Sequence, residues 1–256
     1  MPYKRILLKL SGNLFGPTNG SGLHIPAVET IANEVISAHQ KGFQIAIVNG
    51  AGNIFRGRSR PEEFDPAAAD RIGLIATVPN SMALVEILNS KGIDTRLLSA
   101  FEIEGFARHF EPFRARYLLN QGKVIVLTGG TGNPFFTTDT ASVVRALEIK
   151  ADVLLKATDV DGVYSADPNT DLSAMKYASL SYDQAIEKRL HIMDQTAFTL
   201  ASENKLPIVV FKFKKGSIAK ILNDTTMGTL ITYYRDHKSR GKTKGEKNIA
   251  VTSIQK

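Results

Sequence analysis

The sequence contains no cysteine, which excludes disulfide bonds and thiolate metal sites. A chain without cysteine is compatible with a reducing cytoplasm, and we expect a cytoplasmic protein. No apolar stretch approaches the roughly 20 residues that a membrane-spanning helix needs. The short apolar run at residues 1–10 is interrupted by Lys9 and is not followed by a small-residue cleavage site, so it predicts a strand instead of a signal peptide. We therefore expect a soluble protein that makes no membrane contact.

Several familiar catalytic motifs are also missing. The five histidines do not have the spacing of metal ligands, so no metal held by the protein is expected. A dinucleotide-binding fingerprint would need a third glycine where Phe55 and Phe135 stand. Residues 241–243 read Gly-Lys-Thr, like the end of a Walker A loop, but Asp236 replaces the required earlier glycine and no strand precedes it. The sequence thus argues against both a dinucleotide-binding protein and a P-loop kinase.

The net charge of +7 is unevenly distributed. Residues 235–256 contain seven Lys or Arg and two acidic residues, a net charge of +5, which leaves only +2 for the rest of the chain. A basic tail of this kind is typical of a solvated, disordered end. We predict one domain over residues 1–234 and a disordered tail over residues 235–256, with nucleic-acid binding through the tail as the alternative.

Strand-like and helix-like segments alternate along the chain. Continuous apolar runs predict buried strands at 3–10, 43–48, 96–99, 123–128, 151–155 and 208–213. Helical spacing of apolar residues predicts helices at 25–41 and 71–90, and Pro79 predicts a kink or break in the second of them. Helices are also predicted at 112–121, where proline stands near the first turn, and at 137–150. Continuous apolar strands separated by helices indicate a mostly parallel sheet covered on both faces. The predicted fold is α/β, a three-layer αβα sandwich.

Three of the predicted strands run into glycine-rich turns. These turns are Ser11-Gly12, Gly50-Ala51-Gly52 and residues 129–132. Ligands of parallel α/β sheets bind outside the carboxyl ends of the strands, and glycines allow backbone N–H groups to approach phosphate oxygens. One such turn alone is more often a tight connection. Three in one sheet, together with Lys9 and Arg56, favour a polyphosphate site.

Four longer segments carry a family resemblance. KRILLKLSG from Lys4, GNIFRG from Gly52, TGNPFFTTD from Thr131 and ADVLLKATDVDGVYSADP from Ala151 resemble bacterial uridylate kinases of the amino-acid-kinase superfamily. IATVPNSMAL, MDQTAFTLA and LPIVVF resemble the same family, and the resemblance extends from residue 4 to about residue 232. It implies the amino-acid-kinase fold and transfer of the γ-phosphoryl of ATP to UMP in pyrimidine nucleotide biosynthesis. Mg²⁺ would arrive with ATP, held mainly by phosphates and water.

This chemistry needs charge neutralisation more than a strong base. The second pKa of a phosphate is about 6, so the acceptor oxygens of UMP are already largely ionised near neutral pH. The resemblance implies that Lys9 neutralises the transferring phosphoryl and that Asp139 orients it. Lys9 could otherwise be a surface lysine at a strand end, and Asp139 could merely cap a helix beginning near residue 140. Lys156 is a second strand-end lysine that is ambiguous between phosphate contact and the surface.

The resemblance also implies roles for the other site residues. The catalytic set is Lys9, Asp139, Arg56 and Asp194. The ATP-binding set is Lys9, Leu10, Ser11, Gly12, Gly52, Arg56, Thr158, Tyr164 and Asp167. The UMP-binding set is Ala51, Asp70, Thr131, Gly132, Asn133, Pro134, Phe135, Phe136, Thr137 and Thr138. For Asp70 the competing interpretation is an N-cap of a helix beginning near Arg71, and for Phe135 and Phe136 it is a place in the core.

The sequence departs from the family pattern at three positions. Asn13 stands where the family usually has glutamate, Ala51 interrupts a run of glycines, and Pro79 falls in a helix that usually lacks proline. If position 51 needs a positive φ, alanine costs roughly 1–2 kcal/mol. These departures keep two alternatives open: a kinase of the same fold with another acceptor, and a non-enzymatic nucleotide-binding, sensing or storage homologue. The resemblance further implies a homohexamer activated by GTP and inhibited by UTP, with Arg96 near the effector region.

Overall fold

The computed structural model describes residues 3–233 except 57–60, 167, 169, 172 and 191. Asp167 and the tail from residue 234 lie outside the described residues, so the predicted domain boundary and the predicted disorder of the tail stay predictions. The strands are β1 Arg5–Leu10, β2 Gln44–Asn49, β3 Thr95–Ser99, β4 Arg108–His109, β5 Val124–Thr128, β6 Val153–Thr158, β7 Val163–Tyr164, β8 Lys176–Tyr177, β9 Ser179–Ser181, β10 Ile208–Lys212 and β11 Thr229–Thr232. The helices are α1 Ile25–His39, α2 Pro66–Ser90, α3 Pro112–Asn120, α4 Thr138–Glu148, α5 Tyr182–Glu187, α6 Gln195–Glu203 and α7 Ser217–Asn223, with 3-10 turns η1 Gly12–Phe15 and η3 Thr225–Met227.

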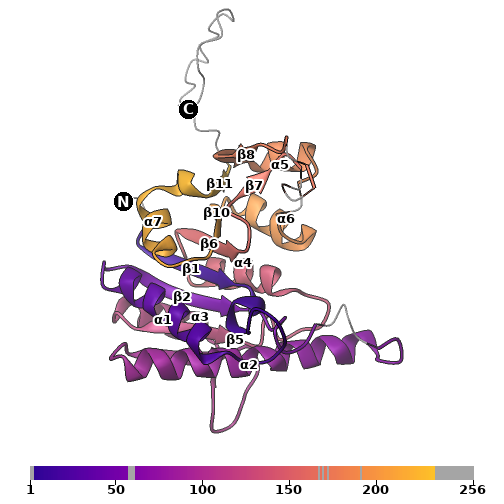
Figure 1. Cartoon of the computed structure of the whole chain (residues 1–256). Coiled ribbons are helices and arrows are strands. Elements are labelled where there is room, and N and C mark those ends of the chain that lie inside the picture. The colour runs from indigo at the N-terminus through magenta and orange to yellow at the C-terminus, as the bar shows by residue number, and fades with distance from the viewer. Residues whose placement is uncertain are drawn as a thin grey trace, which may run out of the picture.

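A nine-stranded sheet forms the middle of the molecule, in the order β4-β3-β5-β2-β1-β6-β10-β11-β9. All its neighbouring strands run parallel except β10 and β11, which are antiparallel. β1 therefore sits near the centre, between β2 and β6 (Figure 1). The predicted mostly parallel sheet is confirmed, and the carboxyl ends of its parallel strands lie at one edge.

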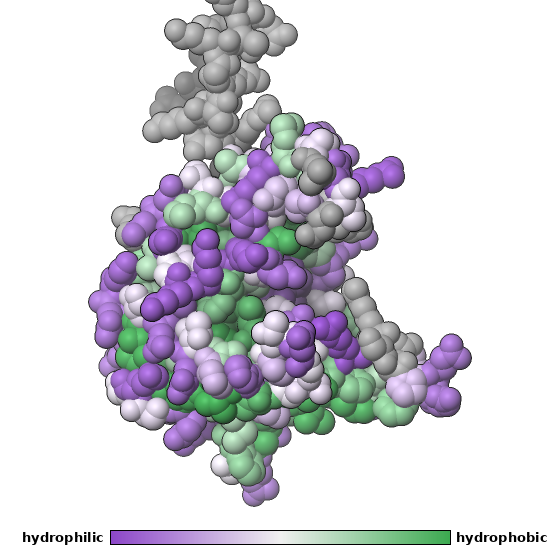
Figure 2. All heavy atoms as spheres, viewed as in Figure 1, coloured by the Kyte–Doolittle hydropathy of each residue, from purple (hydrophilic) through white to green (hydrophobic). Residues whose placement is uncertain are grey.

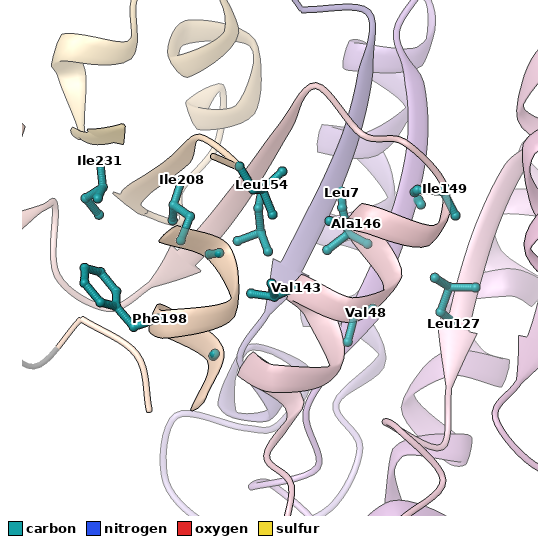
Figure 3. Close-up of a cluster of buried hydrophobic side chains, with 14 of the residues drawn as sticks. Leu7, Val48, Leu127, Val143, Ala146, Ile149, Leu154, Phe198, Ile208 and Ile231 are labelled. Carbon is teal, nitrogen blue, oxygen red and sulfur yellow. The ribbon is translucent and has the colours of Figure 1, made fainter. Parts of the chain in front are cut away.

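Two hydrophobic cores lie on opposite faces of this sheet. Successive side chains of a strand point to opposite faces, so Leu7 of β1 joins one core while Ile6 and Leu8 join the other. The Leu7 core packs under α3, α4, α5 and α6, and part of it is drawn in Figure 3. The Ile6 core packs under α1, α2 and α7. Helices on both faces make the predicted three-layer αβα sandwich, which is confirmed.

Helix α2 begins earlier than predicted and is continuous to Ser90. It begins at Pro66, where the side chain of Asp65 accepts a hydrogen bond from the Ala68 N–H at 2.8 Å. Asp70 therefore lies inside the helix, and the N-cap interpretation of Asp70 is wrong. The prediction at Pro79 was a kink or a break; the helix continues through this proline, so there is no break. Proline removes one helical N–H, but the surrounding turn is held by packing and side-chain hydrogen bonds.

Within the described part of the chain, α2 is also the one helix long and apolar enough to cross a membrane by length and composition. The expectation that no segment reaches this length and apolarity was therefore too strong. Its most apolar window is 44% buried in the fold, and Leu84 and Leu88 lie in the core against the sheet. Such burial is typical of the core helix of a soluble protein, so the helix is weak support for a membrane span.

Candidate active site

Two lysines lie side by side at the carboxyl edge of the sheet. β1 and β6 are parallel neighbours, and their register pairs Lys9 with Lys156. Neighbouring strands lie about 4.8 Å apart, and residues paired in register point to the same face. Leu7 and Leu154, each two residues earlier, both point into the core under α4. The two ammonium groups are therefore directed towards the same helix.

Asp139, in the first turn of α4, lies between these lysines. Its Oδ1 is 2.8 Å from Lys9 Nζ, and its Oδ2 accepts a hydrogen bond from Lys156 Nζ at 2.6 Å. The N-cap of α4 is Thr137, whose hydroxyl accepts from the Asp139 and Thr140 N–H groups. The alternative in which Asp139 merely caps the helix is therefore wrong, because Thr137 has that role and Asp139 pairs with two lysines.

The cluster carries an excess of one positive charge in a mostly buried place. The side chains of Lys9 and Lys156 are each 11% exposed and that of Asp139 is 16% exposed. Burial by itself would raise the pKa of Asp139, but the ammonium groups of Lys9 and Lys156 outweigh it and hold that pKa below its usual value. Burial also lowers the pKa of Lys156, against the opposing effect of Asp139. One carboxylate for two cations leaves charge available for an anionic ligand.

Two cavities border the cluster. The first, about 600 Å³, is lined by Lys9, Ser11, Gly12, Asn13, Gly50, Ala51, Gly52, Phe55, Arg56 and Thr138. The second, about 550 Å³, is lined by Lys156, Thr158, Tyr164 and residues of the loops around positions 162 and 189. We name them the glycine cavity and the tyrosine cavity. Lys9 lines one and Lys156 the other, so Asp139 links the two through its ion pairs. The fold thus joins two spaces of small-ligand size through a charged cluster.

The glycine cavity has a tight backbone wall. A Cβ at Gly12 would lie 2.8 Å from the Ala51 nitrogen, which is closer than real Cβ contacts. Ala51 itself is not among the residues with positive φ, so the left-handed strain considered for this alanine does not arise. Arg56 Nη2 donates to the Asn13 side-chain oxygen at 2.7 Å, and Arg56 Nε donates to the Gly52 carbonyl at 2.9 Å. The neutral Asn13 therefore orients the guanidinium without cancelling its charge.

The predicted UMP loop lies against α2. The Phe135 N–H donates to the Asp70 carboxylate at 2.8 Å, and Phe135 adopts a φ of 67°. The side chains of Phe135 and Phe136 are exposed, at 71% and 45%, so their interpretation as core residues is wrong. The Asn133 N–H donates to the Thr131 hydroxyl at 3.1 Å, which closes the turn before Pro134. Asp70 thus ties a helix to this loop, and Gly132 completes the turn with a φ of 84°.

Asp194 connects α6 to α4. Its carboxylate caps α6 by accepting from the Ala197 N–H at 2.9 Å, and it also accepts hydroxyl hydrogen bonds from Thr137 at 2.5 Å and Thr140 at 3.0 Å. Asp194 also raises the pKa of Lys156 by its charge, a smaller effect than that of burial. Its geometry is that of a residue that positions α4 beside the lysines.

Three predicted ATP-binding residues, Leu10, Thr158 and Tyr164, lie outside the lysine cluster. The Leu10 side chain is fully buried in the Ile6 core, because the strand alternation turns it away from Lys9. Only its backbone faces the glycine turn, where its carbonyl accepts from the Gly50 N–H at 3.0 Å. The Thr158 hydroxyl donates to the Val160 carbonyl at 2.7 Å, and Tyr164 donates its hydroxyl hydrogen to Asp161 at 2.6 Å. Thr158 and Tyr164 both line the tyrosine cavity.

A family model described as the amino acid kinase family matches residues 4–212. This chain belongs to the amino acid kinase family. Among solved structures, UMP kinase from Bacillus anthracis is 38% identical with a TM-score of 0.88, over 91% of this chain and 97% of the other. UMP kinase from Ureaplasma parvum is 29% identical with a TM-score of 0.85, over 91% and 100%. Uridylate kinase from Archaeoglobus fulgidus is 29% identical with a TM-score of 0.68, over 89% and 99%.

Lys156 has a larger part in this site of an amino acid kinase than the sequence predicted. It shares Asp139 with Lys9, donates to the Ile192 carbonyl at 2.7 Å and lines the tyrosine cavity. A signal for it existed, since both strands read Leu-Leu-Lys at matching positions. Asn13 was noted only as a departure, and its contact with Arg56 has no signature in the sequence because 43 residues separate them.

Proposed function

We propose that the protein is a UMP kinase, which transfers the γ-phosphoryl of ATP to UMP and yields ADP and UDP. The observation that carries the proposal is the Lys9–Asp139–Lys156 cluster between two cavities of nucleotide-compatible size. The acceptor is inferred from the similarity to UMP kinases, which extends over 91% of the chain. Neither another acceptor nor a non-enzymatic role draws support from a specific feature of the described site.

In this proposal ATP reaches across the cluster from the tyrosine cavity. The adenosine lies near Thr158 and Tyr164, and the phosphates pass over Lys156 towards Lys9. The γ-phosphate end of ATP lies in the glycine cavity near Gly12, Gly52 and Arg56, and UMP approaches from the loop held by Asp70. An ionised oxygen of the UMP phosphate attacks the γ-phosphorus, and the bond from that phosphorus to the bridging oxygen of ADP breaks. No side chain needs to remove a proton, since the attacking oxygen is already ionised.

The side chains then act by position and charge. Lys9 and Lys156 stabilise the negative charge spread over the transferring phosphoryl. Arg56 and the backbone N–H groups near Gly12 and Gly52 hold the other phosphates of ATP. Asp139 keeps both ammonium groups in place. Since its carboxylate serves two cations, the pair retains one positive charge for the phosphoryl.

Mg²⁺ fits this site as a companion of ATP. Among the residues that the structure describes, no group of three His, Cys, Asp or Glu side chains could hold a metal ion, and Asp139 is already engaged by lysines. The phosphates and water would therefore supply its ligands, and the ion would neutralise phosphate charge.

We further propose a cytoplasmic homohexamer, activated by GTP and inhibited by UTP, that acts in pyrimidine nucleotide biosynthesis. Self-association is supported by exposed apolar side chains along α2, with Ile72 40%, Ile75 59% and Met82 39% exposed. Figure 2 has hydrophobic residues gathered over the lower part of the molecule, where α2 runs. An effector site is supported by a cavity of about 600 Å³ whose lining includes Arg96, Arg108 and Arg114.

The experiment that tests the activity follows ADP formation with Mg-ATP and, separately, UMP, CMP, dTMP, acetylglutamate or carbamate. We expect ADP formation that depends on UMP, and we expect Lys9→Ala to reduce its rate at least about a hundredfold, because the variant loses a charge aimed at the transition state. Turnover with another acceptor would overturn UMP as the substrate and leave phosphoryl transfer from ATP as the reaction. Binding of UMP without any turnover would favour the non-enzymatic alternative.

A further inference from the structure

One buried turn of α2 carries three polar side chains beneath the site. Thr77, Asn80 and Ser81 are 1%, 0% and 0% exposed, and we call them the polar turn of α2. Burying a hydroxyl or an amide is costly unless it is hydrogen-bonded. Each of the three is hydrogen-bonded: Asn80 and Thr77 have partners on the glycine-rich turns that follow β2 and β5, and Ser81 bonds to Asn49 at the end of β2. The polar turn therefore contacts both turns at once, although none of its residues lines the glycine or the tyrosine cavity.

Asn80 holds the turn after β2. Its amide nitrogen donates to the Gly50 carbonyl at 3.0 Å and to the Asn53 side-chain oxygen at 2.8 Å. The Asn53 amide returns a hydrogen bond to the Asn80 side-chain oxygen at 2.9 Å. The two amides thus form a reciprocal pair that spans the outer side of the turn. Gly50, Ala51 and Gly52 line the glycine cavity on the inner side.

Ser81 supports the same turn from the end of β2. Its hydroxyl donates to the Asn49 side-chain oxygen at 2.6 Å. The Asn49 amide donates back to the Thr77 carbonyl at 3.0 Å. The end of β2 and one turn of α2 are therefore joined by hydrogen bonds in both directions.

Thr77 holds the turn after β5. Its hydroxyl donates to the Leu74 carbonyl at 2.7 Å and accepts from the Gly129 N–H at 2.9 Å. The Thr128 hydroxyl lies 2.8 Å away as a further partner. One donor and two acceptor positions are thus all used, so the hydroxyl is saturated. Gly129 begins the loop that leads to Thr131 and Asn133.

We propose that the polar turn of α2 is a positioning element for phosphoryl transfer, which sets the spacing between the phosphate-binding turn at Gly50–Asn53 and the acceptor loop that starts at Gly129. This inference rests on the proposed function. Saturated buried networks specify one geometry, and a shift of about 1 Å between reacting groups can reduce a rate about a hundredfold. Thr77 acts on the acceptor side, and Asn80 and Ser81 act on the phosphate side.

The test uses Thr77→Val, which keeps the shape of the side chain and removes the hydroxyl that accepts from Gly129. We expect the KM for UMP to rise about tenfold, since a buried N–H loses its partner, while the KM for ATP stays within about twofold. Thr77→Ser restores the hydroxyl and should return the KM for UMP to within about twofold of the wild-type value. Hydrogen exchange of a peptide containing Gly129 should accelerate in Thr77→Val and remain slow in Thr77→Ser.

Ser217→Ala is the matched control. Ser217 is 4% exposed, and its hydroxyl accepts from the Lys214 N–H at 3.2 Å at the start of α7, outside both cavity linings. This variant should lower the melting temperature without changing either KM. Equal changes of both KM values in Thr77→Val, or a Thr77→Ser variant as impaired as Thr77→Val, would overturn the inference.

Asn133→Ala separates the inference from the proposed function. If Asn133→Ala raises the KM for UMP and Thr77→Val does not, the positioning role is wrong and the UMP assignment stands. If neither variant changes it, the assignment of the acceptor loop fails and the inference fails with it.

Discussion

At the scale of single residues, the contact between Asp139 and Lys9 is unusual. Asp139 Oδ1 is buried and lies 2.8 Å from Lys9 Nζ, yet this contact does not have hydrogen-bond geometry. Oδ2, by contrast, receives a hydrogen bond from Lys156. Lys9 is therefore held at Asp139 Oδ1 by an ion pair. Lys156 is held more firmly, since it also donates to the Ile192 carbonyl.

The lowered pKa of Lys156 leads to a prediction about alkaline pH. Burial, with Lys9 nearby, lowers this pKa below its ordinary value despite the opposing charge of Asp139. As the pH rises through the lowered pKa, Lys156 loses its charge and the phosphates of ATP lose a partner. We therefore expect kcat/KM for ATP, which reports on the free enzyme, to fall at a lower pH than an unperturbed lysine near 10.4 would give.

Lys156→Arg tests the assignment of that fall. Arginine stays protonated to above about pH 12, so the alkaline decline should move to higher pH even if the altered geometry reduces the maximal rate. The measurement is the pH profile of kcat/KM for both proteins. Identical alkaline limbs would mean that another group controls the decline.

At the scale of elements, the junction between the end of β1 and the turn after β2 allows little change. Gly12 lies against the backbone of Ala51 and Gly52, so an added methyl group would meet peptide atoms that cannot rotate away. Both elements line the glycine cavity. We expect Gly12→Ala to reduce kcat/KM at least about a hundredfold by displacing the turn. Steady-state kinetics with both nucleotides would measure it, and near-normal kinetics would contradict the close approach.

Asp65→Ala is a control for this element-scale effect. Asp65 caps α2 through the Ala68 N–H and lies outside both cavity linings. Loss of the cap should reduce the free energy of unfolding by about 1 kcal/mol and leave the kinetics unchanged. The comparison separates destabilisation of an element from displacement of the site.

At the scale of the whole molecule, the apolar residues left exposed on α2 predict self-association. Ile75→Glu places a charge on this face, which should be unfavourable if a second copy covers it. We expect analytical ultracentrifugation to detect a smaller assembly than for the wild-type protein. Ile186→Glu is the matched control, because Ile186 on α5 is similarly exposed at 57%. An unchanged assembly in Ile75→Glu would show that another face makes the contacts.

Much of the fold was readable from the chain because it depends on local pattern. Apolar runs predicted the strands β1, β2, β3, β5, β6 and β10, periodic apolar residues predicted helices α1 and α2, and α3 and α4 were also predicted. Short elements such as β7 and β8 gave no such pattern, since strands of two residues show no period. The start of α2 was misplaced because only Asp70 was weighed as a cap, although Asp65 followed by Pro66 is the pattern of a helix start.

The sequence by itself determined the order of the longer strands and of helices α1 to α4, the glycine turns at strand ends and the candidate residues Lys9, Arg56 and Asp139, since these follow from local spacing and from resemblance. The tertiary structure decided which groups meet. The register of β1 with β6 brings Lys156 beside Lys9, and the packing of α2 on the sheet places Thr77 and Asn80 under two turns. These pairings join residues separated by 30 to 147 positions along the chain. Their reason is long-range backbone pairing and the need of buried polar groups for partners, which no local pattern encodes.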